Sequence, residues 1–194
     1  MNTRKQLWLL VGGNGAGKSA FYRLKLQPLG IPFVNADVIA KQVFPDSPEE
    51  HSYEAAQMAS ELRHDLLYQG KSFCYETVFS HPSKIDFVAQ AKALGYQVIM
   101  VFIHVERSEI NRARVAQRVS EGGHNVPDDK VEARIPRLLN HVKTTIGLCD
   151  QVRILDNSRY DNPFRPVATL RDQSLETHLE PMPEWAKMVL AVDH

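Results

Sequence analysis

The sequence predicts an α/β fold in which a mainly parallel sheet lies between two layers of helices. Five apolar, β-rich segments recur along the chain, and each is separated from the next by a helix-like stretch. Strands that alternate with helices are typical of parallel sheets with helices on both faces. The expected strands span residues 7–11, 33–35, 73–76, 98–105 and 151–155.

The expected helices are marked by residues that favour helix starts and ends. Ser47 and Pro48, followed by two glutamates, predict the start of a long helix that continues to Gln69, just before a glycine. Similar signals delimit the helices that connect the later strands. These further helices are expected over residues 83–94, 106–121 and 128–148.

The last part of the chain differs in composition from the rest. Proline is frequent in residues 159–194, where we expect an edge strand at 167–170 and a short helix from Pro183. A chain of 194 residues has the length of one domain with a sizeable core. We therefore expect a single domain over residues 1–194, with its core in about residues 6–158.

A glycine-rich segment directly follows the first expected strand. It has the Gly-x-x-x-x-Gly-Lys-Ser pattern of a phosphate-binding loop in its strand-to-helix setting, which makes the predicted fold a P-loop NTPase. Glycines let backbone N–H groups curl around phosphates, and the following helix adds the positive end of its dipole. We expect ATP here, with Lys18 between the outer phosphates and Ser19 as a Mg²⁺ ligand. The segment consists of Gly12, Gly13, Asn14, Gly15, Ala16, Gly17, Lys18 and Ser19.

Charge and cysteine content argue against several classes of protein. Basic and acidic residues each number 23, so no net charge attracts a nucleic acid or an anionic membrane. Cys74 and Cys149 have neither metal-ligand spacing nor a disulfide framework. No apolar run approaches membrane-spanning length or resembles a signal peptide. We therefore expect a cytoplasmic protein without a membrane or nucleic-acid partner.

Polar residues at the ends of the expected strands are candidates for catalysis, because ligands of open α/β sheets gather there. Asp37 is expected to accept the proton of an acceptor hydroxyl, and its structural alternative is a helix N-cap. Glu76 is expected to hold Mg²⁺ through water or to position the acceptor together with Thr77, and its structural alternative is a solvated acid at a strand end. Asn157, after the fifth strand, is a candidate for contact with the nucleotide.

Arginines flank a glycine pair at residues 122–123, between two of the expected helices. Arg114 and Arg118 lie one helical turn apart before the pair, and Arg134 follows it. Guanidinium groups that close over a transferring phosphoryl group stabilise its charge, so these residues predict an arginine-bearing lid. The alternative is a solvated basic face paired with nearby glutamates. His124, next to the glycines, is a candidate for contact with the substrate or a phosphate, and its alternative is a solvent-exposed loop histidine without a role.

Together, these segments resemble the zeta-toxin-like P-loop kinases, in particular their short members. The resemblance implies a Mg-ATP-dependent kinase with a nucleoside-monophosphate-kinase-like core. Larger members of this family phosphorylate a hydroxyl of UDP-N-acetylglucosamine and act as toxins that a partner protein, the antitoxin, neutralises. The matching segments are the phosphate loop, residues 35–37, 76–77 and 114–119, Gly122-Gly123-His124-x-Val126-Pro127, Arg134 and residues 156–158.

The resemblance also implies roles for individual residues. This chain is too short for the insertions with which larger members build their sugar-nucleotide pocket. The residues that match family positions are Lys18 for phosphate, Ser19 for Mg²⁺, Asp37 as base, Glu76 in the substrate site, and Arg118 and Arg134 for charge stabilisation.

These observations predict an ATP-dependent kinase that phosphorylates a hydroxyl of a small molecule, for which the family suggests a UDP-sugar. A polynucleotide 5′-hydroxyl kinase would use the same core, but it needs a basic track that the balanced charge disfavours. A third hypothesis is a nucleotide-binding switch with slow ATPase activity. The switch differs from both kinases in having no need of a carboxylate at Asp37.

Overall fold

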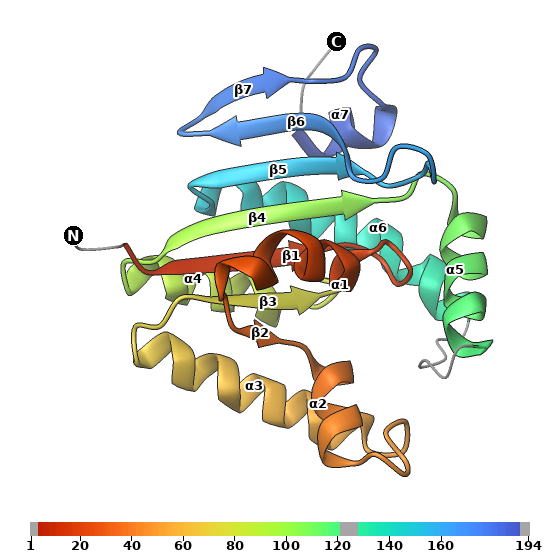
Figure 1. Ribbon diagram of the computed structural model, residues 1–194. Helices are drawn as coiled ribbons and strands as arrows, with labels where there is room; N and C mark the ends of the chain where they lie inside the picture. Colours follow the sequence, from red (N-terminus) through yellow and green to blue (C-terminus); the bar gives the residue numbers. More distant parts are fainter. Residues whose placement is uncertain (1–3, 121–127, 191–194) are drawn as a thin grey trace.

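The computed structural model describes residues 4–120 and 128–190, and its strands closely follow the five expected segments. Figure 1 shows them in one twisted sheet. The strands are β1 (Gln6–Val11), β2 (Phe33–Val34), β3 (Phe73–Thr77), β4 (Gln97–His104), β5 (Gln151–Asp156), β6 (Arg165–Arg171) and β7 (Ser174–Thr177).

Helices connect these strands. The α-helices are α1 (Lys18–Phe21), α2 (Ala36–Val43), α3 (Ser52–Tyr68), α4 (Ser83–Ala93), α5 (Ser108–Ser120), α6 (Asp128–Thr145) and α7 (Glu184–Leu190). Three short turns complete the set, namely the π-helical η1 (Tyr22–Leu26) and the 3₁₀ turns η2 (Gln27–Leu29) and η3 (Ile146–Leu148).

The strand order is β2-β3-β1-β4-β5-β6-β7. The first five strands in this order are parallel, whereas β6 and β7 are antiparallel to their neighbours. The chain moves from β1 to one edge of the sheet and then crosses back to β4, which creates a switch point beside β1. Ligands of open α/β sheets bind at such a point, next to the carboxyl ends of the strands.

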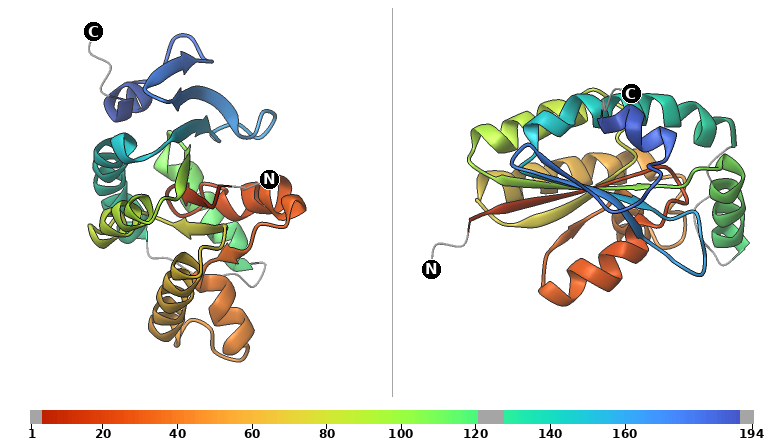
Figure 2. Two further views of the ribbon diagram at one scale, coloured as in Figure 1. Left: turned by 90° about the vertical axis from the view of Figure 1, so that its left-hand side faces the viewer. Right: turned by 90° about the horizontal axis from the view of Figure 1, so that it is seen from above.

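Helices α3, α4, α6 and α7 cover one face of the sheet (Figure 2). Alternate residues of each strand point to this face, as the period of a strand requires. From β1, Leu7, Leu9 and Val11 enter the larger core cluster, where they meet apolar side chains from the four helices. We call this side of the sheet the covered face.

The opposite side of the sheet is covered only in part. Trp8 and Leu10 of β1 point to this side, where Phe21 of α1 and Leu26 of η1 pack against the sheet in a second core cluster. In Figure 2, no helix of the described chain lies over β5, β6 or β7 on this side. We call it the open face. Because β1 and β4 are buried on both sides, their sequences are nearly continuous apolar runs.

Two of the expectations for single elements are wrong: the residue at which α3 begins and the strand that forms the edge of the sheet. Helix α3 begins at Ser52, not at Pro48, because the preceding residues form a loop in which the His51 ring stacks on Phe44 at a centroid distance of 4.2 Å. The expected edge strand is β6, but the edge of the sheet is β7. Asp172 and Gln173 both have positive φ angles and join the two strands in a tight turn. The turn lacks the glycine or asparagine that usually signals such a hairpin.

No helix within residues 4–120 and 128–190 combines the length and apolar character needed to cross a membrane. Cys74 and Cys149 are free thiols. Burial raises the pKa of both thiols, and for Cys149 the value is about 12. Both cysteines are therefore protonated at neutral pH and behave as small packing residues.

Candidate active site

Lys18 lies inside the phosphate-binding loop that connects β1 to α1. Its ammonium group donates hydrogen bonds to the carbonyl oxygens of Gly12 and Gly13, each at 2.9 Å. The residue is only 6% exposed, so its charge is directed into the loop and not into solvent. The loop therefore presents a fixed positive charge where this motif binds phosphate oxygens.

Two glycines let the loop approach its neighbours closely. Gly17 has a left-handed conformation with φ 97°, and a Cβ atom there would lie 2.5 Å from Nδ2 of Asn157. A Cβ atom on Gly12 would collide with the carbonyl oxygen of Ile103 on β4. Both positions need glycine to fit against the sheet, in addition to any contact with a phosphate.

Ser19 and Glu76 join the loop to the end of β3. The Ser19 hydroxyl donates to Oε2 of Glu76 at 2.8 Å, and Nζ of Lys18 lies 3.7 Å from Oε1 of the same carboxylate. The Glu76 side chain is 12% exposed, and a charge in such a place needs a partner. Hydroxyl and carboxylate oxygens are ligands that Mg²⁺ prefers, so this pair fits a magnesium ion brought with a nucleotide.

Asp37 lies in the first turn of α2, exposed at the same edge of the sheet. The N-cap of this helix is Asn35, whose Oδ1 accepts from the N–H of Val38 at 3.1 Å. Asn35, and not Asp37, is therefore the N-cap of this helix. The parallel register of β2 and β3 places Asn35, the residue after β2, level with Glu76, and Asp37 follows two residues later in α2.

Asn157 fixes the loop after β5 to the phosphate-binding loop. Its side-chain amide donates to the carbonyl oxygen of Ala16 at 2.8 Å and accepts from the N–H of Phe164 at 3.2 Å. The residue is buried. Because the bond to Ala16 connects positions 141 residues apart, Asn157 ties the shape of the phosphate loop to the second half of the chain.

Arg114 of α5 reaches the same region. Its Nη1 donates to the carbonyl oxygen of Asn157 at 2.9 Å. Burial lowers the pKa of Arg114, although the nearby Asp156 partly opposes this effect. Asp156 itself pairs with Arg165 at 2.6 Å. Burial alone would raise the pKa of Asp156, but hydrogen bonds from Ser158 and Arg165 together lower it, so the carboxylate stays ionised at neutral pH.

Arg134 of α6 extends to the tip of the phosphate loop. Its Nη1 lies 3.4 Å from Oδ1 of Asn14, which brings α6 and the loop together across 120 residues. Arg137 is exposed and bonds to the backbone of its own helix. Arg118 belongs to α5, but its side chain lies outside the described part of the chain, as does all of His124. Their expected roles in the site stay predictions.

Thr77, the other residue expected beside the acceptor, ends β3. Its hydroxyl oxygen accepts from the N–H of Phe79 at 3.0 Å. Phe79 has a positive φ angle of 63°, and its carbonyl oxygen lies 2.9 Å from Nδ1 of His141 on α6. These contacts fix the segment after β3, directly beyond Glu76, between the sheet and α6.

Sequence reasoning missed two residues that shape the site. Asn111 of α5 is 2% exposed, and a Cβ atom on Gly15 would lie 2.6 Å from its backbone oxygen. Its Oδ1 is buried without a hydrogen-bond partner among the described residues. Phe164 packs edge-to-face on Phe21 at 5.5 Å, beside the phosphate loop. Neither residue belongs to a motif, so no local signal in the sequence marks it.

Comparison with solved structures shows the fold of P-loop kinases. The structure titled AvrRxo1-ORF1:-ORF2 with ATP has a TM-score of 0.73 at 18% identity, and the match covers 91% of this chain and 61% of that chain. A structure from the PezAT toxin–antitoxin system of Streptococcus pneumoniae has a TM-score of 0.62 at 17% identity, with 90% and 71% covered. A gluconokinase from Sinorhizobium meliloti has a TM-score of 0.51 at 12% identity, with 82% and 86% covered. The chain thus spans about three fifths of the AvrRxo1-ORF1:-ORF2 chain that it matches.

Sequence comparison identifies the family. An uncharacterized protein from Haemophilus influenzae is 33% identical over 138 residues, which are 68% of this chain and 98% of that protein. The sequence profile described as Zeta toxin matches residues 1–163, a range that includes the phosphate loop, Asp37, Glu76 and Asn157. The chain therefore belongs to the Zeta toxin family.

Proposed function

We propose that this protein is a Mg-ATP-dependent kinase that transfers the γ-phosphoryl group of ATP to a hydroxyl of a small molecule. One observation carries the proposal. The phosphate loop, with the buried Lys18, is joined to the strand-end carboxylate of Glu76 through Ser19 and through Lys18 itself. A hydroxyl and a carboxylate fixed beside the loop cation can hold the Mg²⁺ that accompanies ATP, and the exposed Asp37 of α2 adds the base that a kinase needs and a nucleotide-dependent switch does not.

The phosphate loop binds the donor. Backbone N–H groups and the Lys18 ammonium surround the β- and γ-phosphates, while the Ser19 hydroxyl and Glu76 carboxylate provide oxygens for Mg²⁺. When bound, this ion neutralises charge on the phosphate oxygens. Arg134, which already contacts the loop tip through Asn14, adds positive charge where negative charge develops during transfer.

Asp37 is the catalytic base in this mechanism. The acceptor hydroxyl oxygen attacks the γ-phosphorus while the Asp37 carboxylate takes the hydroxyl proton. The bond between the γ-phosphorus and the bridging oxygen breaks, and ADP leaves with the electron pair. Asp37 is exposed in α2, directly after the strand that pairs with β3, which leaves it accessible to an acceptor.

The acceptor binds at the edge formed by α2, Glu76 and Thr77. The family resemblance suggests a UDP-sugar such as UDP-N-acetylglucosamine, and we include it in the proposal as the first compound to test. The structural neighbour from the PezAT toxin–antitoxin system supports a protein partner of the antitoxin kind as part of the same proposal. Such a toxin would arrest growth when it is expressed alone in a bacterial host.

The test compares wild type with Asp37→Asn, which keeps the size of the side chain but removes its basic carboxylate. Both proteins are incubated with radiolabelled ATP, Mg²⁺ and a panel of sugar nucleotides, nucleosides, aminoglycosides and a 5′-hydroxyl oligonucleotide. We expect label in one small-molecule acceptor, a transfer rate about 10²- to 10⁴-fold lower in Asp37→Asn, and unchanged ATP affinity.

Asp46→Asn is the control, because Asp46 is an exposed aspartate in the loop after α2. It should transfer phosphate at the rate of wild type. Label in the oligonucleotide alone would show a polynucleotide kinase. ATP turnover that labels no acceptor and is equal in wild type and Asp37→Asn would show a nucleotide-dependent switch. Growth arrest by wild type but not by Asp37→Asn would support the toxin role.

A further inference from the structure

A concave surface lies on the open face of the sheet, beside β5 and β6. It encloses about 1200 Å³ and receives residues from β1, η1, β5 and the β6–β7 hairpin. It exists because β5 continues into this hairpin, while α7 packs on the covered face (Figure 2). We call it the basic groove and define it by six of its lining residues, which are Trp8, Leu26, Gln151, Arg153, Phe164 and Arg171.

Two guanidinium groups meet in the basic groove. Oriented with its amide oxygen toward them, Gln151 accepts from Nε of Arg153 at 3.1 Å and from Nη2 of Arg171 at 3.2 Å. Burial, and then the charge of Arg171, lower the pKa of Arg153. Among residues 4–120 and 128–190, no carboxylate forms an ion pair with either guanidinium. A neutral amide thus holds two like charges together.

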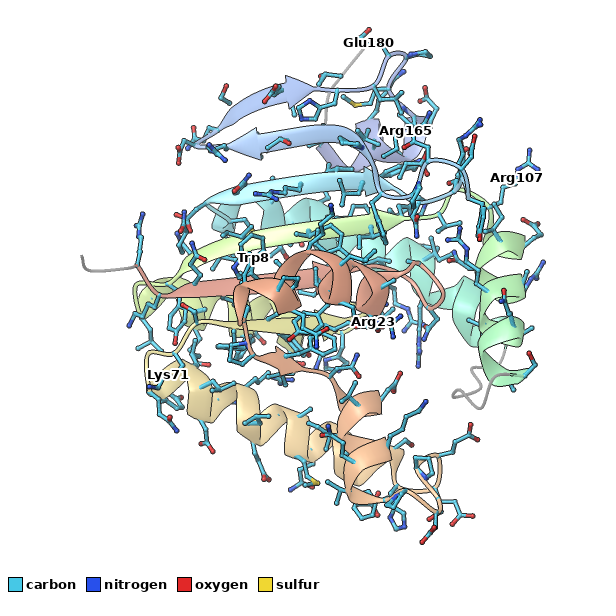
Figure 3. All side chains as sticks on the ribbon, viewed as in Figure 1. Trp8, Arg23, Lys71, Arg107, Arg165 and Glu180 are labelled. Carbon is cyan, nitrogen blue, oxygen red and sulfur yellow. The ribbon has the colours of Figure 1, made fainter. Side chains whose placement is uncertain are left out.

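Two acidic residues also line the groove, but neither forms an ion pair with Arg153 or Arg171 in the described part of the chain. Glu176 on β7 lies 3.7 Å from Nδ1 of His178, and Asp172 is exposed in the β6–β7 turn. Lys25 adds a third cation from η1. Arg165, labelled in Figure 3, also lines the groove, but its charge is already paired with Asp156.

Apolar side chains surround the two guanidinium groups. The guanidinium carbon of Arg153 lies 5.5 Å from the centre of the Trp8 ring, which Figure 3 labels on β1. Leu26 and Phe164 line the same surface and join the core cluster of the open face. An apolar wall beside convergent polar groups is typical of small-molecule sites.

We propose that the basic groove binds a small organic anion, with a phosphate or carboxylate group between Arg153 and Arg171 and an apolar body against Trp8, Leu26 and Phe164. Paired guanidinium forks match the oxygens of either group and form strong, charge-assisted hydrogen bonds. An anion would also relieve the repulsion between the two cations. This site is distinct from the proposed kinase site and adds a second ligand to the protein.

The test uses the two tryptophans as reporters, because Trp8 lies on the open face and Trp185 on the covered face. Phenyl phosphate and benzoate are titrated into ¹⁵N-labelled protein, and the two indole N–H resonances are followed by NMR. The Trp185→Phe variant assigns them. We expect a saturable shift of the Trp8 resonance alone, retained in Lys18→Ala, which separates the groove from the phosphate loop. The probe with the lower dissociation constant in this titration identifies phosphate or carboxylate as the preferred group.

The double variant Arg153→Gln/Arg171→Gln should weaken binding by roughly tenfold or more, because it removes both charged donors. Its matched control is Lys71→Gln/Lys143→Gln, which removes two exposed cations elsewhere and should leave the affinity within about twofold. Thermal unfolding of each variant confirms that it is folded. The proposal is wrong if neither probe shifts Trp8 saturably, or if the arginine variant binds as tightly as wild type. Neither result depends on phosphoryl transfer, so the two proposals fail independently.

Discussion

Each face of the sheet holds one tryptophan against a basic side chain, and the two pairs differ in charge. On the covered face, the ring of His104 lies 4.5 Å from that of Trp185, and the residue is buried. Burial lowers the pKa of His104 to about 4, although Asp156 partly opposes this effect, so the ring is neutral. On the open face, Arg153 lies over Trp8 and keeps its charge at neutral pH.

The difference between the faces follows from what covers them. Helix α7 covers β4 on the covered face and shields His104 from water. Burial disfavours the charged ring, so the side chain is neutral. No helix within residues 4–120 and 128–190 covers the open face over β5 and β6, and a guanidinium with its very high pKa stays ionised even when it is half-buried. The covered face thus holds His104 neutral, whereas the open face leaves Arg153 charged and available to a ligand.

Lys18 lies in the loop at the end of β1 and is a buried basic residue. Its substitution should have the largest effect of the variants compared. Its ammonium group donates hydrogen bonds to two carbonyl oxygens and lies 3.7 Å from the Glu76 carboxylate. Lys18→Met removes the charge from the phosphate loop and should lower phosphoryl transfer, measured as ADP formation with acceptor, roughly 10²- to 10³-fold. Lys25→Met, which removes an exposed cation seven residues later, should change the rate less than about twofold. Equal losses in the two variants would contradict the role of Lys18.

His104 provides the next largest effect, through the dependence of stability on pH. Its pKa is about 4 in the folded state against 6.5 for the ordinary group, so below about pH 6.5 the unfolded chain binds a proton that the native ring does not. Stability from this residue is therefore complete above that pH and is lost as the pH falls toward 4. The loss amounts to about 3 kcal/mol in the free energy of unfolding.

Urea unfolding of wild type and His104→Phe at about pH 7 and about pH 4.5 measures this contribution. The phenyl ring keeps the contact with Trp185 but cannot bind a proton, so the variant should lose less stability between the two conditions. His81→Phe removes an exposed histidine and should behave like wild type. If His104→Phe loses as much stability as wild type, the covered face does not hold His104 neutral.

The smallest expected effect is on the free energy of unfolding of two glycine variants. The comparison distinguishes backbone strain at a positive φ angle from a collision with a neighbouring residue. Gly17 and Gly30 both have positive φ angles, 97° and 69°, but only Gly17 would place a Cβ atom against another residue, Asn157. Gly30→Ala should lower the free energy of unfolding by about 1 kcal/mol through strain alone. Gly17→Ala should lower it by about 1 kcal/mol more and weaken ATP binding. Equal unfolding midpoints in urea would show that the contact with Asn157 does not constrain the loop.

Most of the fold could be predicted because its signals are local. The apolar run of β4 and the glycine pattern before Lys18 each specify one element and its neighbour in the chain. Two boundaries failed where local signals competed with tertiary contacts. The stacking of His51 on Phe44 keeps the residues before Ser52 in a loop, so α3 begins later than expected. The turn at Asp172 and Gln173 leads into β7, a strand that no glycine in the sequence signals.

The sequence by itself determined the phosphate loop, the α/β class and the family, because these depend on residue types at fixed spacings. Only the tertiary structure decided which distant residues meet. Examples are Ser19 with Glu76, Asn157 with Ala16, and Arg153 with Arg171. Strand order and register bring these groups together, and neither can be predicted from the spacing of residues along the chain. The basic groove is the clearest example. It forms where the β6–β7 hairpin extends the sheet and no helix of the described residues covers the open face.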